Sequence, residues 1–131
     1  MQFGYTIVYV PDVAGSLRFF EQAFGLTTRF LHESGSYGEL ETGATALAFA
    51  DHALGAMHFP AGHVRADQST LPLGMEIALV TADVPVAHAR ALAAGATEMK
   101  APAAMPWGQT VSWVRCPDGC LVELCTPIQP A

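Results

Sequence analysis

Three cysteines that lie close together are among the residues whose type and spacing could support chemistry. Cys116, Cys120 and Cys125 fall within ten residues, and clustered thiolates are ligands that zinc prefers. The Cys-x3-Cys-x4-Cys spacing is wider than that of a tight zinc pair, however, and no histidine is nearby. The odd count also argues against a disulfide framework. We therefore interpret the three thiols as small, buried core residues.

Five histidines offer imidazole groups that could bind a metal or move protons. His88 lies on the apolar stripe of a predicted helix, which favours a structural role, and His32 lies beside a predicted turn, which favours contact with solvent. The other three belong to an irregular segment and are expected in a surface loop. The three histidines of this segment are His52, His58 and His63. The alternative is that Met57, His58 and Phe59 fold as a lid over a cavity between the two halves of the chain.

A phenol and a carboxylate occupy equivalent positions of an internal repeat. The segments YTIVYVPDVAGSLRFFEQAFGL (5–26) and EIALVTADVPVAHARALAAGA (76–96) share one pattern of apolar strand, aspartate and helix. Asp12 and Asp83 are 83 − 12 = 71 residues apart, and the same offset relates Tyr5 to Glu76. Sites commonly form where two halves of a protein meet. We therefore expect equivalent positions to face each other across a shared cavity.

The strands and helices that would position these groups follow the same plan twice. Residues 3–10 have the alternation of a strand, and a helix capped by Asp12 runs to Gly25. Residues 75–81 predict another strand, and Asp83 can cap the next helix. Residues 52–74 lose periodicity and are expected to connect the halves. The remaining predicted strands are TTRFLHE, SYGELET and TALAFAD, and those near 97–101, 108–115 and 120–126.

Length and composition limit the classes of function. The 131 residues suit one domain whose halves share a core, and with 51% hydrophobic and 14% charged residues the chain is globular. The net charge of −6 and the scattered Lys and Arg residues exclude a basic patch, so nucleic acid is not an expected partner. Without a long apolar run or a signal-peptide pattern, we expect a soluble, cytoplasmic protein with no membrane partner. The low charge content favours a homodimer.

The repeat and three short motifs resemble the vicinal oxygen chelate superfamily, which includes glyoxalase I, bleomycin resistance proteins, fosfomycin resistance enzymes and extradiol dioxygenases. The motifs are YVPDV before the first helix, WGQ at 107–109 and CPDGCLVEL at 116–124. The resemblance implies an α+β fold in which two βαβββ modules form a cupped, eight-stranded mixed sheet with helices outside. It implies one domain over 1–131, with module 1 at 1–51, a linker at 52–74 and module 2 at 75–131.

Enzymes of this superfamily hold a divalent metal with one ligand from the first and one from the last strand of each module. The resemblance assigns these four positions to Tyr5, Leu47, Glu76 and Glu123. The set contains no histidine and one aliphatic residue, and neutral tyrosine is a poor ligand. We therefore predict no cofactor. If a divalent metal is present, Glu76 and Glu123 are its expected ligands.

Without a metal, Glu76 and Glu123 are expected to face each other across an apolar cup. They would then act as an acid/base pair or as anchors for a ligand, and the alternative is a structural pair with Arg115, Gln109 or Tyr5. The strand registers place further residues around the ligand, with Trp107 at the rim. A one-residue slip would turn Trp113 toward the helices. The expected ligand-binding residues are Tyr5, Leu47, Phe49, Trp107 and Trp113.

These residues favour a protein that binds a small, partly aromatic or cationic molecule in its cup without an obligatory metal. The resemblance to the bleomycin resistance branch also favours binding, because members of that branch bind and sequester their ligand rather than transform it. The alternative is a metal-dependent enzyme with a degenerate site, either a lyase or isomerase similar to glyoxalase I or an extradiol-type dioxygenase. A third alternative is a structural or partner-binding copy of the fold.

Overall fold

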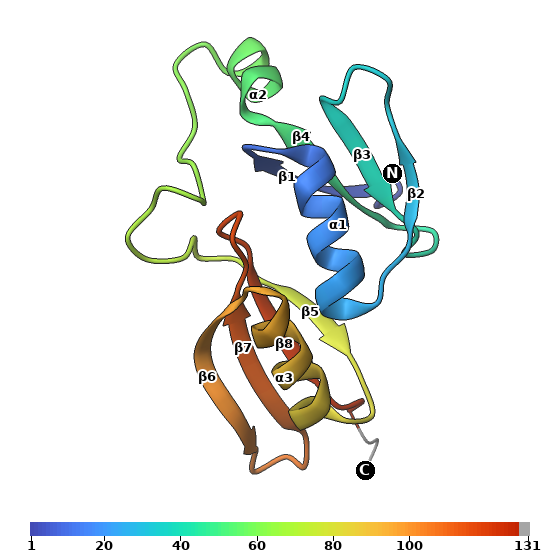
Figure 1. Ribbon diagram of the computed structural model, residues 1–131, viewed down its shortest axis with the longest axis vertical. Helices are drawn as coiled ribbons and strands as arrows, with labels where there is room; N and C mark the ends of the chain where they lie inside the picture. Colours follow the sequence, from blue (N-terminus) through green and yellow to red (C-terminus); the bar gives the residue numbers. More distant parts are fainter. Residues whose placement is uncertain (129–131) are drawn as a thin grey trace.

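The computed structural model describes residues 1–128, and Figure 1 shows two similar halves joined by a long connection. Module 1 contains β1 (Tyr5–Val10), α1 (Val13–Phe24), β2 (Thr28–Leu31), β3 (Tyr37–Leu40) and β4 (Ala46–Asp51). Module 2 contains β5 (Ile77–Val80), α3 (Val84–Ala94), β6 (Thr97–Ala104), β7 (Thr110–Arg115) and β8 (Leu121–Cys125). The α+β class and the two βαβββ modules are confirmed.

Each module forms a four-stranded mixed sheet, with strand order β1-β4-β3-β2 in module 1 and β5-β8-β7-β6 in module 2. The first strand of each module pairs in parallel with the last strand, and the other pairs are antiparallel. The two helices cover the same side of the molecule and pack against each other, as Figure 1 shows. The opposite side of both sheets therefore has no helix from the repeat over it.

The helix boundaries follow from local chemistry. The carboxylate of Asp12 accepts a hydrogen bond from the backbone N–H of Gly15 at 3.1 Å, and Asp83 accepts one from Val86 at 3.2 Å. Each aspartate therefore satisfies a donor that the first helical turn leaves unpaired. Gly25 ends α1 with a φ of 70°, the left-handed conformation that glycine adopts without steric cost.

The core lies between the two helices and the sheets. Phe20 of α1 is fully buried, and its ring centroid lies 5.0 Å from that of Phe49 on β4. Leu47 belongs to the same cluster of buried side chains. Because alternate residues of a strand point to opposite faces, Leu47 and Phe49 both point toward α1. Both side chains therefore pack in this core, and Leu47 also lines a hollow that includes Glu76.

The connection between the modules is more ordered than its composition predicts. Residues His52–His58 form a short helix, α2, which Asp51 caps by accepting the backbone N–H of Leu54 at 2.8 Å. The helix follows β4 directly, and its Gly55 lies against the ring of Tyr9 on β1. The segment 52–74 is thus a helix followed by an irregular stretch with turns that leads to β5 (Figure 1).

Candidate functional site

The side of the sheets away from α1 and α3, here called the bare face, carries the polar and aromatic residues that could bind a ligand. Strand alternation assigns the residues to it, because their strand neighbours belong to the core beneath the helices. Tyr5 is 60% exposed there. The residues of the bare face discussed below are Tyr5, Tyr37, Glu39 and Ala48 in module 1 and Glu76, Ala78, Trp113 and Glu123 in module 2.

Trp113 joins the two predicted glutamates on module 2. Its indole N–H donates a hydrogen bond to the carboxylate of Glu76, and Trp113 is the cross-strand partner of Glu123. The ammonium of Lys100 lies 5.6 Å from the centroid of the Trp113 ring, a distance at which a cation is attracted to an aromatic face. The arrangement presents two carboxylates and an aromatic face side by side.

The thiol of Cys125 lies beside the same carboxylates. Burial raises the pKa of its thiol above the ordinary value, and the neighbouring carboxylates of Glu123 and Glu76 raise it further because negative charge disfavours the thiolate. The three cysteines are buried and free. The thiols therefore belong to the packed interior of module 2.

The repeat predicts that Glu76 and Glu123 face each other across a cup, and the structure does not place them so. Both belong to module 2, where Glu123 on β8 pairs with Ala78, two residues beyond Glu76. The acids are thus diagonal neighbours on adjacent strands of one sheet. The two residues proposed as their alternative partners are engaged elsewhere: Arg115 donates to the backbone oxygens of Ala66, Ser69 and Thr70, and Gln109 donates to that of Thr126.

The strand register also corrects the position in module 1 that corresponds to Glu123. Glu123 pairs with Ala78, and the repeat relates Ala78 to Ile7, whose partner on β4 is Ala48. The equivalent residue is therefore Ala48, one position after Leu47. The four positions that correspond to metal ligands in the superfamily then carry Tyr5, Ala48, Glu76 and Glu123. The methyl side chain of Ala48 cannot bind a metal, so the possible ligands are the two carboxylates of module 2 and the phenol of Tyr5.

Module 1 carries a polar cluster that was not predicted from the sequence. Glu39 on β3 is only 6% exposed and pairs across strands with Ala48. Its carboxylate accepts the hydroxyl of Tyr37 at 2.7 Å and lies 3.4 Å from Nη1 of Arg29. Burial and the hydrogen bond to Glu39 raise the pKa of Tyr37 far above its ordinary value, so this phenol stays protonated. The alternation of Tyr37 and Glu39 in SYGELET was the available signal.

Trp107 lies in the turn between β6 and β7 and is 64% exposed. Its indole N–H donates to the side-chain oxygen of Gln109 at 2.7 Å. This hydrogen bond spans two residues of the same turn, and it holds the ring at the surface of module 2.

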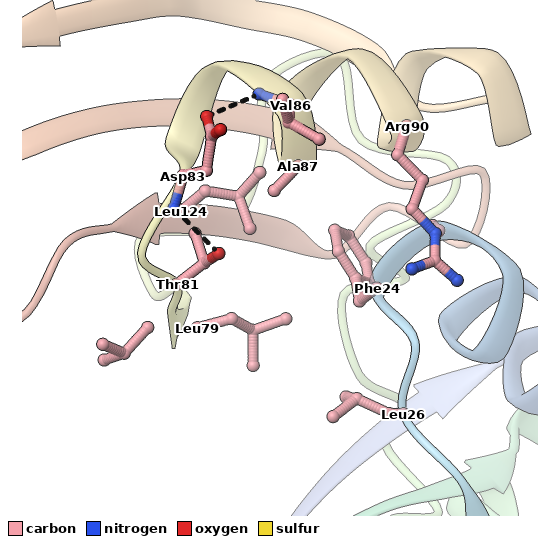
Figure 2. A pocket seen from close by; sticks show the side chains of 11 residues that line it. Phe24, Leu26, Leu79, Thr81, Asp83, Val86, Ala87, Arg90 and Leu124 are labelled. Carbon is pink, nitrogen blue, oxygen red and sulfur yellow. Dashed lines mark hydrogen bonds between the residues drawn. The ribbon is translucent and has the colours of Figure 1, made fainter.

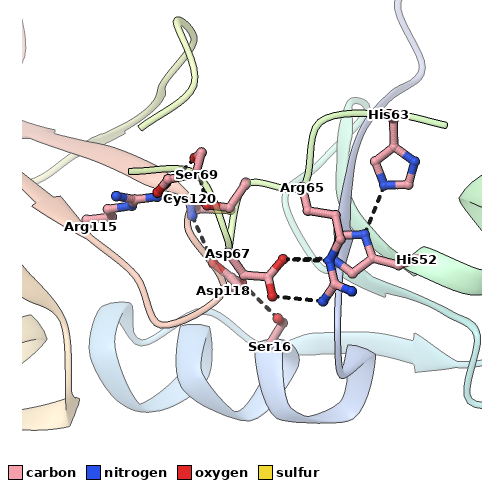
Figure 3. A network of polar contacts seen from close by, with 10 residues as sticks. Ser16, His52, His63, Arg65, Asp67, Ser69, Arg115, Asp118 and Cys120 are labelled. Carbon is pink, nitrogen blue, oxygen red and sulfur yellow. Dashed lines mark hydrogen bonds and ion pairs between the residues drawn. The ribbon is translucent and has the colours of Figure 1, made fainter. Parts of the chain in front are cut away.

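A second polar network lies within the linker and packs against Tyr9 of module 1 (Figure 3). His52 of α2 lies between Asp67 and His63, with its Nε2 3.0 Å from a carboxylate oxygen of Asp67 and its Nδ1 2.9 Å from Nε2 of His63. Arg65 forms two hydrogen bonds to Asp67, at 2.8 and 3.1 Å. The rings of His63 and Tyr9 are 5.1 Å apart. His52 and His63 therefore do not lie in a free surface loop, and the network anchors the linker at one end of the bare face.

A hollow of about 350 Å³ lies where the modules meet beside the two helices (Figure 2). Apolar side chains such as Phe24 and Leu79 line it, with Asp83 and Arg90 at its edge. Asp83 caps α3, and Arg90 donates to the backbone oxygen of Gln22 at 2.8 Å. These polar groups already have structural partners, so the hollow is a packing seam between the modules.

Within residues 1–128 no group of three or more His, Cys, Asp and Glu side chains is arranged to hold a metal ion. In the same residues, no helix is long and apolar enough to cross a membrane.

Comparison with known proteins agrees with the fold and the repeat. A family model described as the Glyoxalase/Bleomycin resistance protein/Dioxygenase superfamily matches residues 2–124. A glyoxalase-related enzyme from Fulvimarina pelagi superposes with a TM-score of 0.81 at 21% identity, over 97% of this chain and 88% of that one. A glyoxalase/bleomycin resistance protein/dioxygenase family enzyme from Burkholderia phytofirmans PsJN superposes with a TM-score of 0.77 at 21% identity, over 98% of this chain and 100% of that one.

A further solved structure, a protein of unknown function from Agrobacterium tumefaciens str. C58, gives a TM-score of 0.76 at 25% identity, over 97% of this chain and 94% of that one. No curated protein matches the sequence. At 21% identity the first two likenesses establish the fold and leave the ligand to be argued from this chain's own residues.

Proposed function

Since the chain belongs to the Glyoxalase/Bleomycin resistance protein/Dioxygenase superfamily, we propose that it binds a small, partly aromatic or cationic organic molecule on its bare face. One observation carries the proposal: Trp113 donates its indole N–H to Glu76 and is the strand partner of Glu123. A carboxylate beside the face of an indole ring suits a cation with an apolar body. Glu76 and Glu123 act as anchors in this proposal, and Trp113 supplies the stacking surface.

The charge around Trp113 supports a cationic ligand. The ammonium of Lys100 already lies over the Trp113 ring, so a ligand cation stacks on that face only by displacing the lysine. Lys100 compensates only part of the local negative charge, because Glu76 and Glu123 together contribute −2 and the lysine +1, which leaves −1. A ligand cation completes the neutralisation and gains contact with the ring.

The proposal includes no obligatory metal. Ala48 removes one donor, Tyr5 offers a phenol, and the two carboxylates belong to the same sheet, where Glu76 already accepts the Trp113 N–H. Transition metals at catalytic sites prefer imidazole nitrogen together with carboxylate. Elemental analysis of protein purified without chelator, followed by titration with nickel, zinc, manganese and iron(II), tests this part. Stoichiometric binding that Glu76→Ala abolishes would favour a metal-dependent enzyme instead.

Titration with benzyltrimethylammonium, an aromatic cation, tests the binding function. We expect saturable quenching of tryptophan emission and a rise in melting temperature, because a ligand that binds only the folded state stabilises it. Glu123→Gln should weaken binding about tenfold, because it removes one of the two negative charges that attract the quaternary ammonium. Glu33→Gln, an exposed change in the β2–β3 turn, is the control. Equal affinities of the Glu123→Gln variant and the parent protein would contradict the anchoring role.

The proposal also includes a homodimer. Tyr5, Met75 and Val80 are large apolar or aromatic side chains that are at least 60% exposed at the strand edges and bare face. Such surfaces are commonly covered in an assembly. Light scattering coupled to size-exclusion chromatography should give twice the mass of 13.8 kDa. A monomer mass over the whole concentration range would contradict this part and leave ligand binding untouched.

A further inference from the structure

An irregularity in β6 places Lys100 opposite Trp113. Glu98 pairs with Val114 and Lys100 pairs with Trp113, so the intervening Met99 has no partner on β7. This is a β-bulge, in which one extra residue on a strand re-aims the side chains that follow it. The register shifts a second time after Lys100. The lysine therefore lies between two irregularities of an otherwise paired strand.

The side chains before and after the first bulge lie on opposite faces of the sheet. The carboxylate of Glu98 lies 2.8 Å from Nε2 of His88 on α3, which is the helix side. Lys100 follows two residues later, and a regular strand would place it on that same side. Its ammonium instead lies 5.6 Å from the centroid of the Trp113 ring, on the bare face. The bulge is thus the local feature that brings a cation to this ring.

The Trp113 ring is held in place, whereas the lysine above it can leave. Trp113 is half-buried, and its N–H is bound to Glu76. Lys100 is exposed and, within residues 1–128, forms no ion pair. Because β6 is the edge strand of its sheet, the lysine side chain can move into solvent without disturbing a neighbouring strand.

The ammonium of Lys100 and a ligand cation compete for the same ring face. The indole quadrupole attracts both of them, and so do the negative charges of Glu76 and Glu123. A cation–π contact at an exposed site changes an equilibrium constant by about threefold. The lysine should therefore lower the affinity of a stacking ligand by about that factor.

We propose that Lys100 is an internal competitor of the ligand, a tethered cation that covers the Trp113 ring in the free protein and moves away when a cationic ligand binds. The contact is autoinhibitory, because the ligand gains the ring face only as the lysine loses it. This inference rests on the proposed function, since it describes the regulation of the same Trp113 site.

The displacement can be observed directly, because Lys100 is the only lysine of the chain. Reductive methylation with carbon-13 formaldehyde labels this lysine and the amino terminus, and the dimethylated amine keeps its positive charge. In the free protein, the ring current of Trp113 should shift the methyl signal of Lys100 in the NMR spectrum. Benzyltrimethylammonium should return this signal to the position of a free lysine, with the same midpoint as the quenching of tryptophan emission. The amino-terminal signal is the internal control, and a Lys100 signal that does not move at saturation would overturn the inference.

Lys100→Met should raise the affinity for benzyltrimethylammonium by about threefold or more. About threefold should persist in about 1 M salt, where a Debye length of about 3 Å screens the effect of the lysine charge at a distance. Arg18→Gln, which removes an exposed positive charge on α1, is the matched control and should leave the affinity unchanged.

A gain that disappears in high salt, or an equal gain in the Arg18→Gln variant, would show that the lysine acts by charge alone and would overturn the inference while leaving the aromatic-cation site in place. Failure of benzyltrimethylammonium to bind either the parent protein or the Lys100→Met variant would instead count against the proposed function itself.

Discussion

The hydroxyl of Ser16 on α1 donates a hydrogen bond of 2.7 Å to the carboxylate of Asp118 in the turn between β7 and β8. Both residues are buried, and they are 102 positions apart in the sequence. The other carboxylate oxygen of Asp118 accepts the backbone N–H of Cys120 at 3.0 Å. This one aspartate therefore shapes the hairpin of module 2 and holds it against the helix of module 1.

Ser16→Ala should lower the free energy of unfolding by about 1–3 kcal/mol, because it leaves a buried carboxylate oxygen without its donor. Urea denaturation followed by circular dichroism measures the change. A double-mutant cycle with Asp118→Ala separates the pair from other effects of each change. A coupling energy near zero would show that the contact does not join the modules energetically.

Gly119→Ala should destabilise the protein much more than Gly62→Ala. The two glycines have nearly equal φ values of +95° and +94°, so alanine meets the same backbone strain at both. A Cβ at Gly119 would overlap the backbone of Ala66 in the linker, whereas nothing lies within 4 Å of one at Gly62. Thermal unfolding of the two variants isolates the contact between the hairpin and the linker. Equal losses would mean that the linker does not pack there.

The three thiols should react slowly with a thiol reagent in the native protein. Burial raises the pKa of Cys116 and of Cys120 far above the ordinary value, with Asp118 adding to the effect, and burial also raises that of Cys125. Thiolate, the reactive form, is therefore scarce at pH 8. Ellman's reagent should label three thiols rapidly in urea and far more slowly without it. Rapid native labelling would contradict the buried placement.

Stability should fall as the pH drops below about 6.5, the ordinary pKa of histidine. Burial, with the charge of Arg65, lowers the pKa of His52 in the folded protein, although Asp67 acts in the opposite direction. The unfolded chain then binds more protons than the folded one between the two pKa values, so unfolding becomes easier as pH falls through this window. At pH values above this window, the contribution of neutral His52 to the free energy of unfolding is fully present.

Urea midpoints between pH 5 and 8 measure this dependence, and His52→Gln should flatten it by removing the titrating ring. His32→Gln, a change at an exposed strand end, is the matched control. An unchanged slope in the His52 variant would assign the dependence to other groups.

Much of the architecture could be predicted from local sequence. The caps Asp12 and Asp83, the apolar stripe of α1 and the glycine turns act within a few residues, and the repeat with its fixed offset implied two modules of the same plan. The helix α2 was missed because it has only seven residues, and a helix that short depends on its cap and on packing against Tyr9 more than on periodicity.

The candidate site depended on the pairing of distant strands. Aligning the two last strands by sequence gave Leu47 as the counterpart of Glu123, and the observed register gives Ala48. Because side chains alternate along a strand, a shift of one residue in the register exchanges the two faces of β4. Leu47 and Phe49 therefore lie in the core and not on the bare face. The cluster of Tyr37, Glu39 and Arg29 likewise required the β2–β3 pairing to bring its members together.

The sequence by itself determined the repeated βαβββ plan, its superfamily and the absence of imidazole from the expected ligand positions, since these follow from residue types and local spacing. Only the tertiary structure decided that Glu76 and Glu123 lie on one sheet, that Glu39 is the acid of the other module and that the linker is anchored by Asp67 and Arg115. Strand register and contacts between distant segments arise from packing of the whole chain, and local propensities do not encode them.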